Sequence, residues 1–387
     1  MKKSKNIVWI DSMVWKIPLF KMYWDEDDLT QVTSKIKSGM SWAAGPEIQA
    51  FEKMIADYQG SKYCVSFNSG TSALHATLLA YGFGPGDEII VPSFTFIATA
   101  NAPLFVGARP VFADIEETTL GLCPEDVTEK ITPRTKAIMP IHYGGVPCRI
   151  KELKEIAEEN NLILIEDAAE ALGAVAGNQK VGTIGDSGML SFCQNKIITT
   201  GEGGAIVTDD KKVFEQLKLL RSHGRPDTVD YFSTTDILDY VTLGYNLRMS
   251  TISAALGIAQ MKKVDELIST RRKDAEYYMS SLRGVGDIRF IEGHPDDFSV
   301  FQLFSLRTNY RDALVKFLAE KSIMTKIYFS PIHKTHFYQN VLKYNPDLPV
   351  TEKVSGDIMS LPFYPGIPQN DLDYVIGAIK EGIESQK

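Results

Sequence analysis

The chain has 387 residues, of which 44% are apolar and 23% are charged. These proportions are ordinary for a globular protein, so they argue against disorder and against a fibrous repeat. The length exceeds what one hydrophobic core normally supports, which favours two packed units. A net charge of −8 offers no extended basic surface, so we expect no nucleic-acid partner.

The sequence indicates neither a leader peptide nor a membrane span. Met1 to Lys5 is basic, but the apolar stretch that follows is interrupted by Asp11 and Lys16. No uncharged apolar run approaches the roughly 18 residues of a membrane helix. The four cysteines contain no Cys-x-x-Cys pair, which argues against a zinc site and a disulfide framework. We therefore expect a cytoplasmic protein without a metal site.

In chain order, two helices are predicted first, over about 25–37 and 48–58, separated by a break at Gly39. The middle of the chain then alternates short β-rich runs with helical segments, which is typical of a mostly parallel sheet flanked by helices. These seven runs cover residues 63–67, 88–91, 109–113, 137–141, 162–165, 188–192 and 204–208.

Beyond about Met249 the pattern predicts one long helical stretch towards Ser280, with Arg271, Arg272 and Lys273 on its solvent face. A smaller α+β segment follows. We therefore predict a large domain over residues 1–260 and a small C-terminal α+β domain over residues 261–387.

Ligands of such sheets bind beyond the carboxyl ends of the strands. After the first predicted strand, Ser69, Gly70, Thr71 and Ser72 open a helix, where backbone N–H groups and hydroxyls converge. This segment can bind a phosphate. Taken alone, a Ser/Thr helix cap explains it more often.

Two further segments follow strands. Asp167 ends a buried strand and could hold a protonated pyridine nitrogen, although a cap or a surface ion pair is the commoner explanation. Lys196 lies between a strand and the glycine turn 201–204 and could form a Schiff base, although most lysines are solvated. A phosphate site, a carboxylate and a lysine past three strands are what pyridoxal 5'-phosphate (PLP) requires, so we infer this cofactor.

Further motifs surround these segments. They are Gly45-x-x-x-x-x-Phe51-Glu52, Ser69-Gly70-Thr71, Gly86-Asp87-Glu88-x-Ile90-x-Pro92, Thr95-Phe96-x-Ala98-Thr99, Glu166-Asp167-Ala168-Ala169, Gly201-Glu202-Gly203-Gly204 after Lys196, and Tyr245-Asn246-x-Arg248-Met249. Together they resemble the DegT/DnrJ/StrS family of PLP-dependent nucleotide-sugar aminotransferases over nearly the whole chain. That resemblance implies fold type I of the PLP enzymes, in the aspartate aminotransferase superfamily.

The resemblance also implies roles for individual residues. Lys196 would be the Schiff-base lysine and proton-transfer base, and Asp167 the partner of the pyridine nitrogen. Phe96 would stack on the cofactor ring. The expected cofactor-binding residues at the phosphate end are Gly70, Thr71, Ser72 and Ser191.

The resemblance also has implications for three other residues. Asn246 matches an asparagine that reaches the cofactor phosphate of a neighbouring subunit, which implies a homodimer with shared active sites. His333 matches a position near the sugar, although a lone histidine is more often structural. Glu170 stands where the family often has Gln or His, and its carboxylate would repel the phenolic oxygen of the cofactor unless a donor offsets it.

The function implied by the resemblance is transfer of an amino group from L-glutamate or glutamine to a nucleotide-linked 3- or 4-keto sugar. The product would be an amino sugar for surface polysaccharide, glycan or natural-product biosynthesis. We expect loops at about 40–46, 231–239 and 328–336 to determine which sugar is accepted.

Two alternatives remain at this point. A PLP-dependent sugar dehydratase of the same fold is disfavoured by Lys196, because those dehydratases resemble this chain but have histidine there. A non-catalytic regulatory protein is disfavoured by the acidic charge and by the absence of a recognisable DNA-binding motif.

Overall fold

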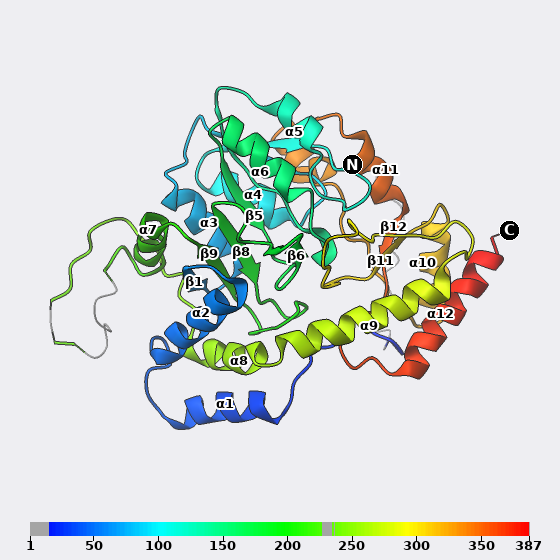
Figure 1. Cartoon of the computed structure of the whole chain (residues 1–387), viewed down its shortest axis with the longest axis horizontal. Coiled ribbons are helices and arrows are strands. Elements are labelled where there is room, and N and C mark those ends of the chain that lie inside the picture. The colour runs from blue at the N-terminus through cyan, green and yellow to red at the C-terminus, as the bar shows by residue number, and fades with distance from the viewer. Residues whose placement is uncertain (1–14, 227–233, 236, 387) are drawn as a thin grey trace.

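A computed structural model describes residues 15–226, 234, 235 and 237–386 of the chain (Figure 1). Its centre is a seven-stranded sheet with strand order β1-β9-β8-β5-β4-β2-β3. Helices surround this sheet, and the C-terminal part, at the right of Figure 1, carries a three-stranded sheet with its own helices. The predicted fold class, α/β with a smaller C-terminal α+β part, is confirmed.

All seven predicted strands are present. Strand β9 runs antiparallel to its neighbours β1 and β8, whereas the other neighbouring pairs are parallel. Six strands therefore end at the edge of the sheet where β9 begins. The strands are β1 Tyr63–Phe67, β2 Glu88–Pro92, β3 Arg109–Ala113, β4 Thr135–Ile138, β5 Ile163–Asp167, β8 Ser187–Ser191 and β9 Gly204–Thr208, with a separate hairpin of β6 Val175–Ala176 and β7 Gln179–Lys180.

Successive side chains along each strand point to opposite faces of the sheet, and a hydrophobic core lies on each face. In β2, Ile89 and Val91 pack in one core with Leu74, whereas Ile90 packs in the other with Phe51. Both cores are closed by helices, which explains why the strands are apolar on both faces. The helices of this part are α1 Glu26–Lys37, α2 Pro46–Gln59, α3 Gly70–Ala80, α4 Ile97–Phe105, α5 Pro124–Lys130, α6 Ile150–Glu159, α7 Lys211–Arg221 and α8 Thr251–Met261, with the 3₁₀ turn η1 Tyr143–Gly145.

The long helical stretch predicted after Met249 is wrong in two respects. It consists of two helices, α8 and α9 (Val264–Leu282), separated at Lys262 and Lys263. Arg271, predicted to face solvent, is buried, and its guanidinium lies 5.5 Å from the centre of the Phe363 ring. The cause is long-range, because a segment about 90 residues later in the chain covers this face of α9.

The C-terminal part is built on an antiparallel sheet of β10 (Arg289–Phe290), β11 (Ser305–Arg307) and β12 (Ile358–Ser360). Its core joins Tyr278 of α9 to Leu306 and Ile379. The predicted domain boundary near residue 260 stays a prediction. The remaining helical elements are α10 Arg311–Glu320, η2 Ile332–Lys334, the π-helical η3 Phe337–Val341, α11 Pro349–Asp357 and α12 Gln369–Glu384.

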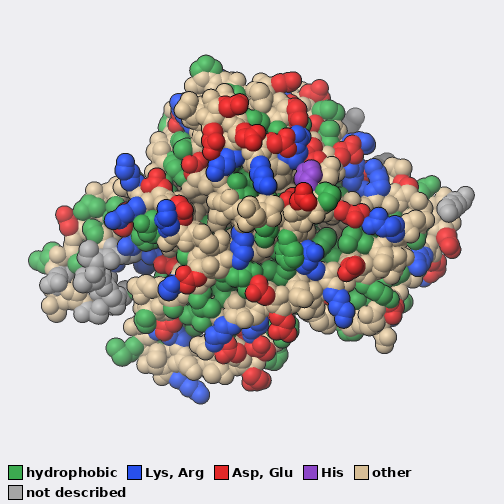
Figure 2. Space-filling view, viewed as in Figure 1, with side chains coloured by type: hydrophobic (Ala, Val, Ile, Leu, Met, Phe, Trp, Pro, Cys, Tyr) green, Lys and Arg blue, Asp and Glu red, His purple; other side chains and the backbone are tan. Residues whose placement is uncertain are grey.

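Basic and acidic side chains are interspersed on the face shown in Figure 2. Within the described ranges, no helix has the length and apolar character needed to cross a membrane. The basic start of the chain and part of the predicted specificity loop at 231–239, namely residues 231–233 and 236, lie outside the described residues.

Candidate active site

The strand-to-helix junction predicted at Gly70 is present. Strand β1 ends at Phe67 and α3 begins at Gly70, with Ser69 as its N-cap. The Ser69 Oγ accepts a hydrogen bond from the Ser72 N–H at 3.1 Å. The cap fixes the start of α3, where the helix dipole and the free N–H groups favour an anion.

Gly70, Ser191 and Gly204 come together at this junction. Ser191 and Gly204 are partners across β8 and β9. A Cβ added to Gly204 would lie 2.6 Å from the backbone nitrogen of Gly70, and a Cβ on Gly70 would lie 3.5 Å from the Ser191 Cβ. The start of α3 can therefore lie this close to β9 only because position 204 has no side chain, whereas the 3.5 Å separation at Gly70 is an ordinary contact.

Asp167 ends β5 at the same edge of the sheet, and its side chain is buried. Its Oδ2 accepts a hydrogen bond from the Thr99 Oγ1 at 2.7 Å, and its Oδ1 accepts one from the Ala169 N–H at 3.2 Å. Burial raises the pKa of Asp167, while these hydrogen bonds and the charge of Lys196 oppose the rise. A cationic partner would stabilise this buried carboxylate.

Lys196 lies on the loop between β8 and β9. The loop is closed at its base by hydrogen bonds from Phe192 N–H to the Gly203 carbonyl and from Thr200 N–H to the Phe192 carbonyl, both at 3.0 Å. This closure directs the loop to the edge where Asp167 and the start of α3 lie. The side chain of Lys196 is 13% exposed, so it is largely buried but not sealed from solvent.

Glu170 lies beside Lys196, with 3.3 Å between Oε1 and Nζ. Its Oε2 accepts a hydrogen bond from the backbone N–H of Gly144 at 2.9 Å. The sequence raised the problem that this carboxylate would repel an oxygen of the cofactor. The structure supplies two donors, an ammonium and a backbone amide, that offset its charge.

Phe96 and Asn246 are both exposed at this edge. Phe96 precedes α4 with 61% of its side chain exposed, so its ring is available for stacking. Asn246 is exposed in a segment whose next residue, Leu247, accepts a hydrogen bond from the Asn68 N–H at 2.9 Å. Asn246 is therefore one residue before a contact with the junction between β1 and α3.

The environment of His333 does not favour the predicted contact with the sugar. The side chain is buried, with Nδ1 2.7 Å from the Ser93 Oγ and Nε2 3.3 Å from the Glu352 Oε1. Both ring nitrogens thus have partners within the chain, and burial lowers the pKa of His333. A purely structural role for this histidine fits the geometry, and a role in substrate binding stays a prediction.

A comparison with protein families identifies the arrangement. Residues 23–380 match the model of the DegT/DnrJ/EryC1/StrS aminotransferase family. The chain belongs to this family. It is therefore a PLP-dependent aminotransferase, as the sequence motifs predicted, and the match favours this activity over the dehydratase and regulator alternatives.

Individual relatives resemble this aminotransferase over most of their length. It is 38% identical to the GDP-perosamine synthase of Caulobacter vibrioides, covering 88% of this chain and 91% of that protein. The structure of S. venezuelae DesV has a TM-score of 0.87 at 31% identity and covers 95% of this chain and 98% of that one. The PLP form of a Streptococcus pneumoniae protein named as a sugar aminotransferase has a TM-score of 0.89 at 26% identity, covering 95% and 99%. Fold type I is therefore confirmed.

The residues of this aminotransferase fit PLP. The start of α3 has free backbone N–H groups that suit a phosphate. The buried Asp167 carboxylate suits a protonated ring nitrogen, and the amine of Lys196 suits an aldehyde. These assignments, with Thr71, Ser72, Ser191 and Phe96, remain proposals that rest on the placement of the side chains.

Sequence reasoning missed several partners of these residues. Thr99, quoted as part of a motif, binds Asp167 directly, and Gly144 binds Glu170. Burial raises the pKa of Tyr328 to about 12, with a smaller contribution from the nearby charge of Glu170. A Gly-Gly pair at 144 and 145 after a buried strand was the available signal for a close backbone approach.

Proposed function

We propose that this aminotransferase moves an amino group from L-glutamate or L-glutamine to a nucleotide-linked 3- or 4-keto sugar. The observation that carries the proposal is the placement of Lys196, Asp167 and the start of α3 at one edge of the sheet. The choice of acceptor is supported by whole-length similarity to GDP-perosamine synthases and to sugar aminotransferase structures. An amino sugar would be the product.

Each side chain would have a distinct task in this reaction. The start of α3 and Ser191 would bind the phosphate, and Asp167 would hold a proton on the ring nitrogen through Oδ1 or Oδ2. Lys196 Nζ would hold the cofactor covalently and, when released, would move the proton at the reacting carbon. When bound, PLP supplies an electron sink for the charge that develops there.

The donor and the acceptor can be tested separately in the purified protein. L-Glutamate alone should change the absorbance of the bound cofactor and release 2-oxoglutarate in a single turnover. A GDP-, UDP- or dTDP-linked keto sugar should then restore the absorbance and sustain turnover. The donor assignment fails if only other amino acids change the spectrum. The acceptor assignment fails if keto acids restore it but no nucleotide sugar does.

Borohydride tests the role of Lys196 independently of turnover. Reduction of the loaded protein should fix the cofactor to the peptide that contains Lys196, and mass spectrometry can locate it. A Lys196→Ala variant should remain unlabelled. Label on another lysine in the wild-type protein would overturn the assignment.

We also propose that the enzyme works as a homodimer with shared sites. Exposed large apolar side chains support this proposal, and they include Trp24, Met40, Trp42, Phe105 and Leu243. Asn246, itself exposed, would reach the phosphate of the partner's site.

Complementation distinguishes a shared site from a self-contained one. A dimer of one Lys196→Ala chain and one Asn246→Ala chain has one intact site if Asn246 serves the partner, and none if it serves its own chain. Random reassortment of the two inactive proteins should therefore recover about a quarter of wild-type activity. No recovery, despite mixed dimers detected by mass spectrometry, would show that Asn246 acts within its own chain.

A further inference from the structure

A short segment of the C-terminal part, Ser299–Leu303, contacts both sides of the Lys196–Glu170 pair. We call it the clamp segment. On one side, the side chain of Gln302 donates a hydrogen bond from Nε2 to the carbonyl of Asn195, the residue before Lys196. The contact joins two parts of the chain that are 107 residues apart.

On the other side, the clamp segment holds the turn η1 behind Glu170. The Gly145 carbonyl accepts hydrogen bonds from the Val300 N–H at 3.0 Å and from the Ser299 Oγ at 3.1 Å. The Gly144 carbonyl accepts one from the Leu303 N–H at 3.2 Å. Since the Gly144 N–H in turn donates to Glu170, the clamp segment controls where that carboxylate lies.

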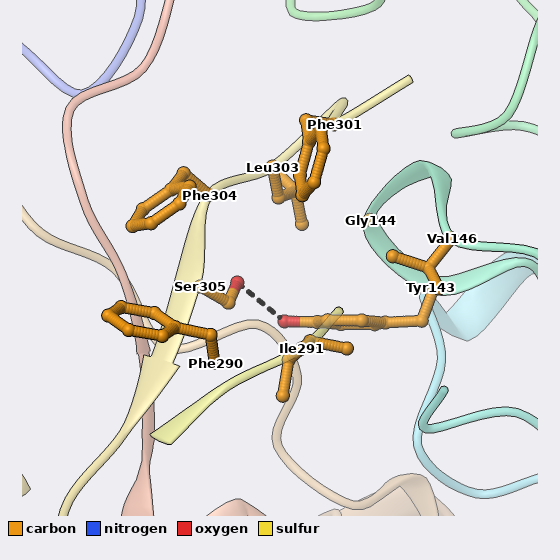
Figure 3. Close-up of a pocket in the computed structure, with 9 residues that line it drawn as sticks. All are labelled: Tyr143, Gly144, Val146, Phe290, Ile291, Phe301, Leu303, Phe304 and Ser305. Carbon is orange, nitrogen blue, oxygen red and sulfur yellow. Dashed lines mark hydrogen bonds between the residues drawn. The ribbon is translucent and has the colours of Figure 1, made fainter. Parts of the chain in front are cut away.

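The approach of the two backbones is close enough to require glycine. Gly145 has a φ of +87°, and a Cβ there would lie 2.8 Å from the backbone nitrogen of Gln302 and 2.9 Å from the backbone carbonyl oxygen of Glu170. Figure 3 shows Phe301 and Leu303 facing Tyr143 and Gly144 across this junction. The cavity between them, about 10 Å³, has room for about one water molecule, so it is a gap in the packing rather than a substrate site.

Helix α9 fixes the clamp segment from behind. Arg271 donates from Nη1 to the Gln302 carbonyl at 3.3 Å, and Arg272 donates from Nη1 to the Ser299 carbonyl. Burial lowers the pKa of Arg271, yet a guanidinium remains charged at neutral pH. A buried cation on a backbone carbonyl makes this anchor strong and directional.

The side chain of Gln302 carries a cost in stability. Its side chain is buried, and within the described residues its Oε1 has no hydrogen-bond partner, which costs free energy. An apolar residue of similar size would avoid that cost. What distinguishes Gln302 from other buried glutamines is its partner, because its Nε2 holds the backbone carbonyl of the residue before Lys196.

We propose that Gln302 is a positioning residue that holds the Lys196 loop, through the Asn195 carbonyl, at a fixed distance from the Glu170 turn. The inference rests on the proposed function, in which Lys196 holds the cofactor and moves the proton. Misplacement of such a group by about 1 Å can cost up to 100-fold in rate. The effect of losing Gln302 therefore falls on the rate of proton movement rather than on donor binding.

The chain offers a matched control in Gln59. It is also a buried glutamine, its Nε2 donates to a backbone carbonyl, that of Val181 at 2.9 Å, and its Oε1 also lacks a partner among the described residues. It ends α2 and does not contact the Lys196 loop. Gln302→Met and Gln59→Met therefore remove the same interaction at two places.

The experiment compares wild type, Gln302→Met and Gln59→Met by thermal unfolding, by borohydride labelling of Lys196 and by the single-turnover rate with L-glutamate. We expect similar melting temperatures for the two variants. Gln302→Met should lower the maximal rate by about tenfold to 100-fold, with the glutamate KM within about twofold of wild type and with Lys196 still labelled by borohydride. Gln59→Met should keep wild-type rates.

Each alternative result has a defined meaning. Equal rates in the two variants, or a loss of rate matched by an equal rise in KM, would overturn the positioning role. A wild-type protein that is not labelled at Lys196 would instead overturn the proposed function. If Gln302→Met does not fold, Ser299→Ala tests the other arm, where a rate below wild type by about twofold or more supports the clamp and an unchanged rate refutes it.

Discussion

Asp167→Asn should separate a carboxylate that holds the cofactor from one that merely caps a strand. The substitution preserves size and removes charge. In the structure, Oδ1 accepts from the Ala169 N–H at 3.2 Å and Oδ2 from the Thr99 Oγ1 at 2.7 Å. An asparagine keeps both contacts, because its amide can donate to Thr99, whose hydroxyl can turn to the Thr95 Oγ1 at 2.8 Å.

The effect on stability follows from the raised pKa of Asp167, which is caused first by burial. For an acid whose folded-state pKa is raised, the folded state binds the proton more tightly than the unfolded state. Stability is therefore lost as pH rises through the unfolded value of 3.8, and the loss is complete above the folded pKa. Asparagine carries no such penalty at neutral pH. The cofactor-free variant should be as stable as wild type or more so, with a change within about 2 kcal/mol.

Turnover should change in the opposite direction. Without a negative charge to hold the proton on the ring nitrogen, the donor half-reaction should slow by about 100-fold or more, the magnitude typical of losing a group that stabilises developing charge. Thermal unfolding of the cofactor-free protein and the single-turnover release of 2-oxoglutarate provide the two measurements.

A true cap elsewhere in the chain provides the control. Asp210 caps α7, where its Oδ1 accepts hydrogen bonds from the N–H groups of Lys212 and Val213. Asp210→Ala should cost about 1 kcal/mol of stability and leave turnover unchanged. If Asp167→Asn behaves in this way, losing stability while retaining near-wild-type turnover, the carboxylate is a cap and our assignment is refuted.

Three further predictions concern other residues of the candidate active site. Thr99→Val removes a hydrogen bond to a charged group and should slow the donor half-reaction by about tenfold, whereas an unchanged rate would show that Thr99 only fills space. Gly204→Ala should weaken PLP affinity by about tenfold or more in a fluorescence titration, because its Cβ would collide with the backbone of Gly70. Gly377→Ala, at an exposed position of α12 with open space for a Cβ, should leave the affinity unchanged and raise stability by about 0.5–1 kcal/mol. Glu170→Gln keeps an acceptor for the Gly144 N–H but loses the ion pair with Lys196, so borohydride should still label Lys196 while the cofactor-free protein melts a few degrees lower, and loss of the label would show that the carboxylate itself is required.

The sequence by itself determined the architecture and the edge of the sheet that carries the chemistry. The periodicity of the seven β-rich runs depends on residues only a few positions apart, so the strands could be predicted without knowledge of tertiary contacts. Strands β1, β3 and β9 lie where they were predicted. The junction at Gly70 and the end of β5 at Asp167 are likewise local features, since a strand end and a helix start are encoded by neighbouring residues.

Only the tertiary structure decided which side chains meet. Arg271 has the local pattern of a solvent-facing residue, yet the segment around Phe363 buries it. His333 lies in a motif associated with a site, yet Ser93 and Glu352 occupy both its ring nitrogens. The contact of Gln302 with the Lys196 loop had no signal in the sequence, because a hydrogen bond between residues about 100 positions apart depends on how packed elements approach one another and leaves no periodicity in the chain.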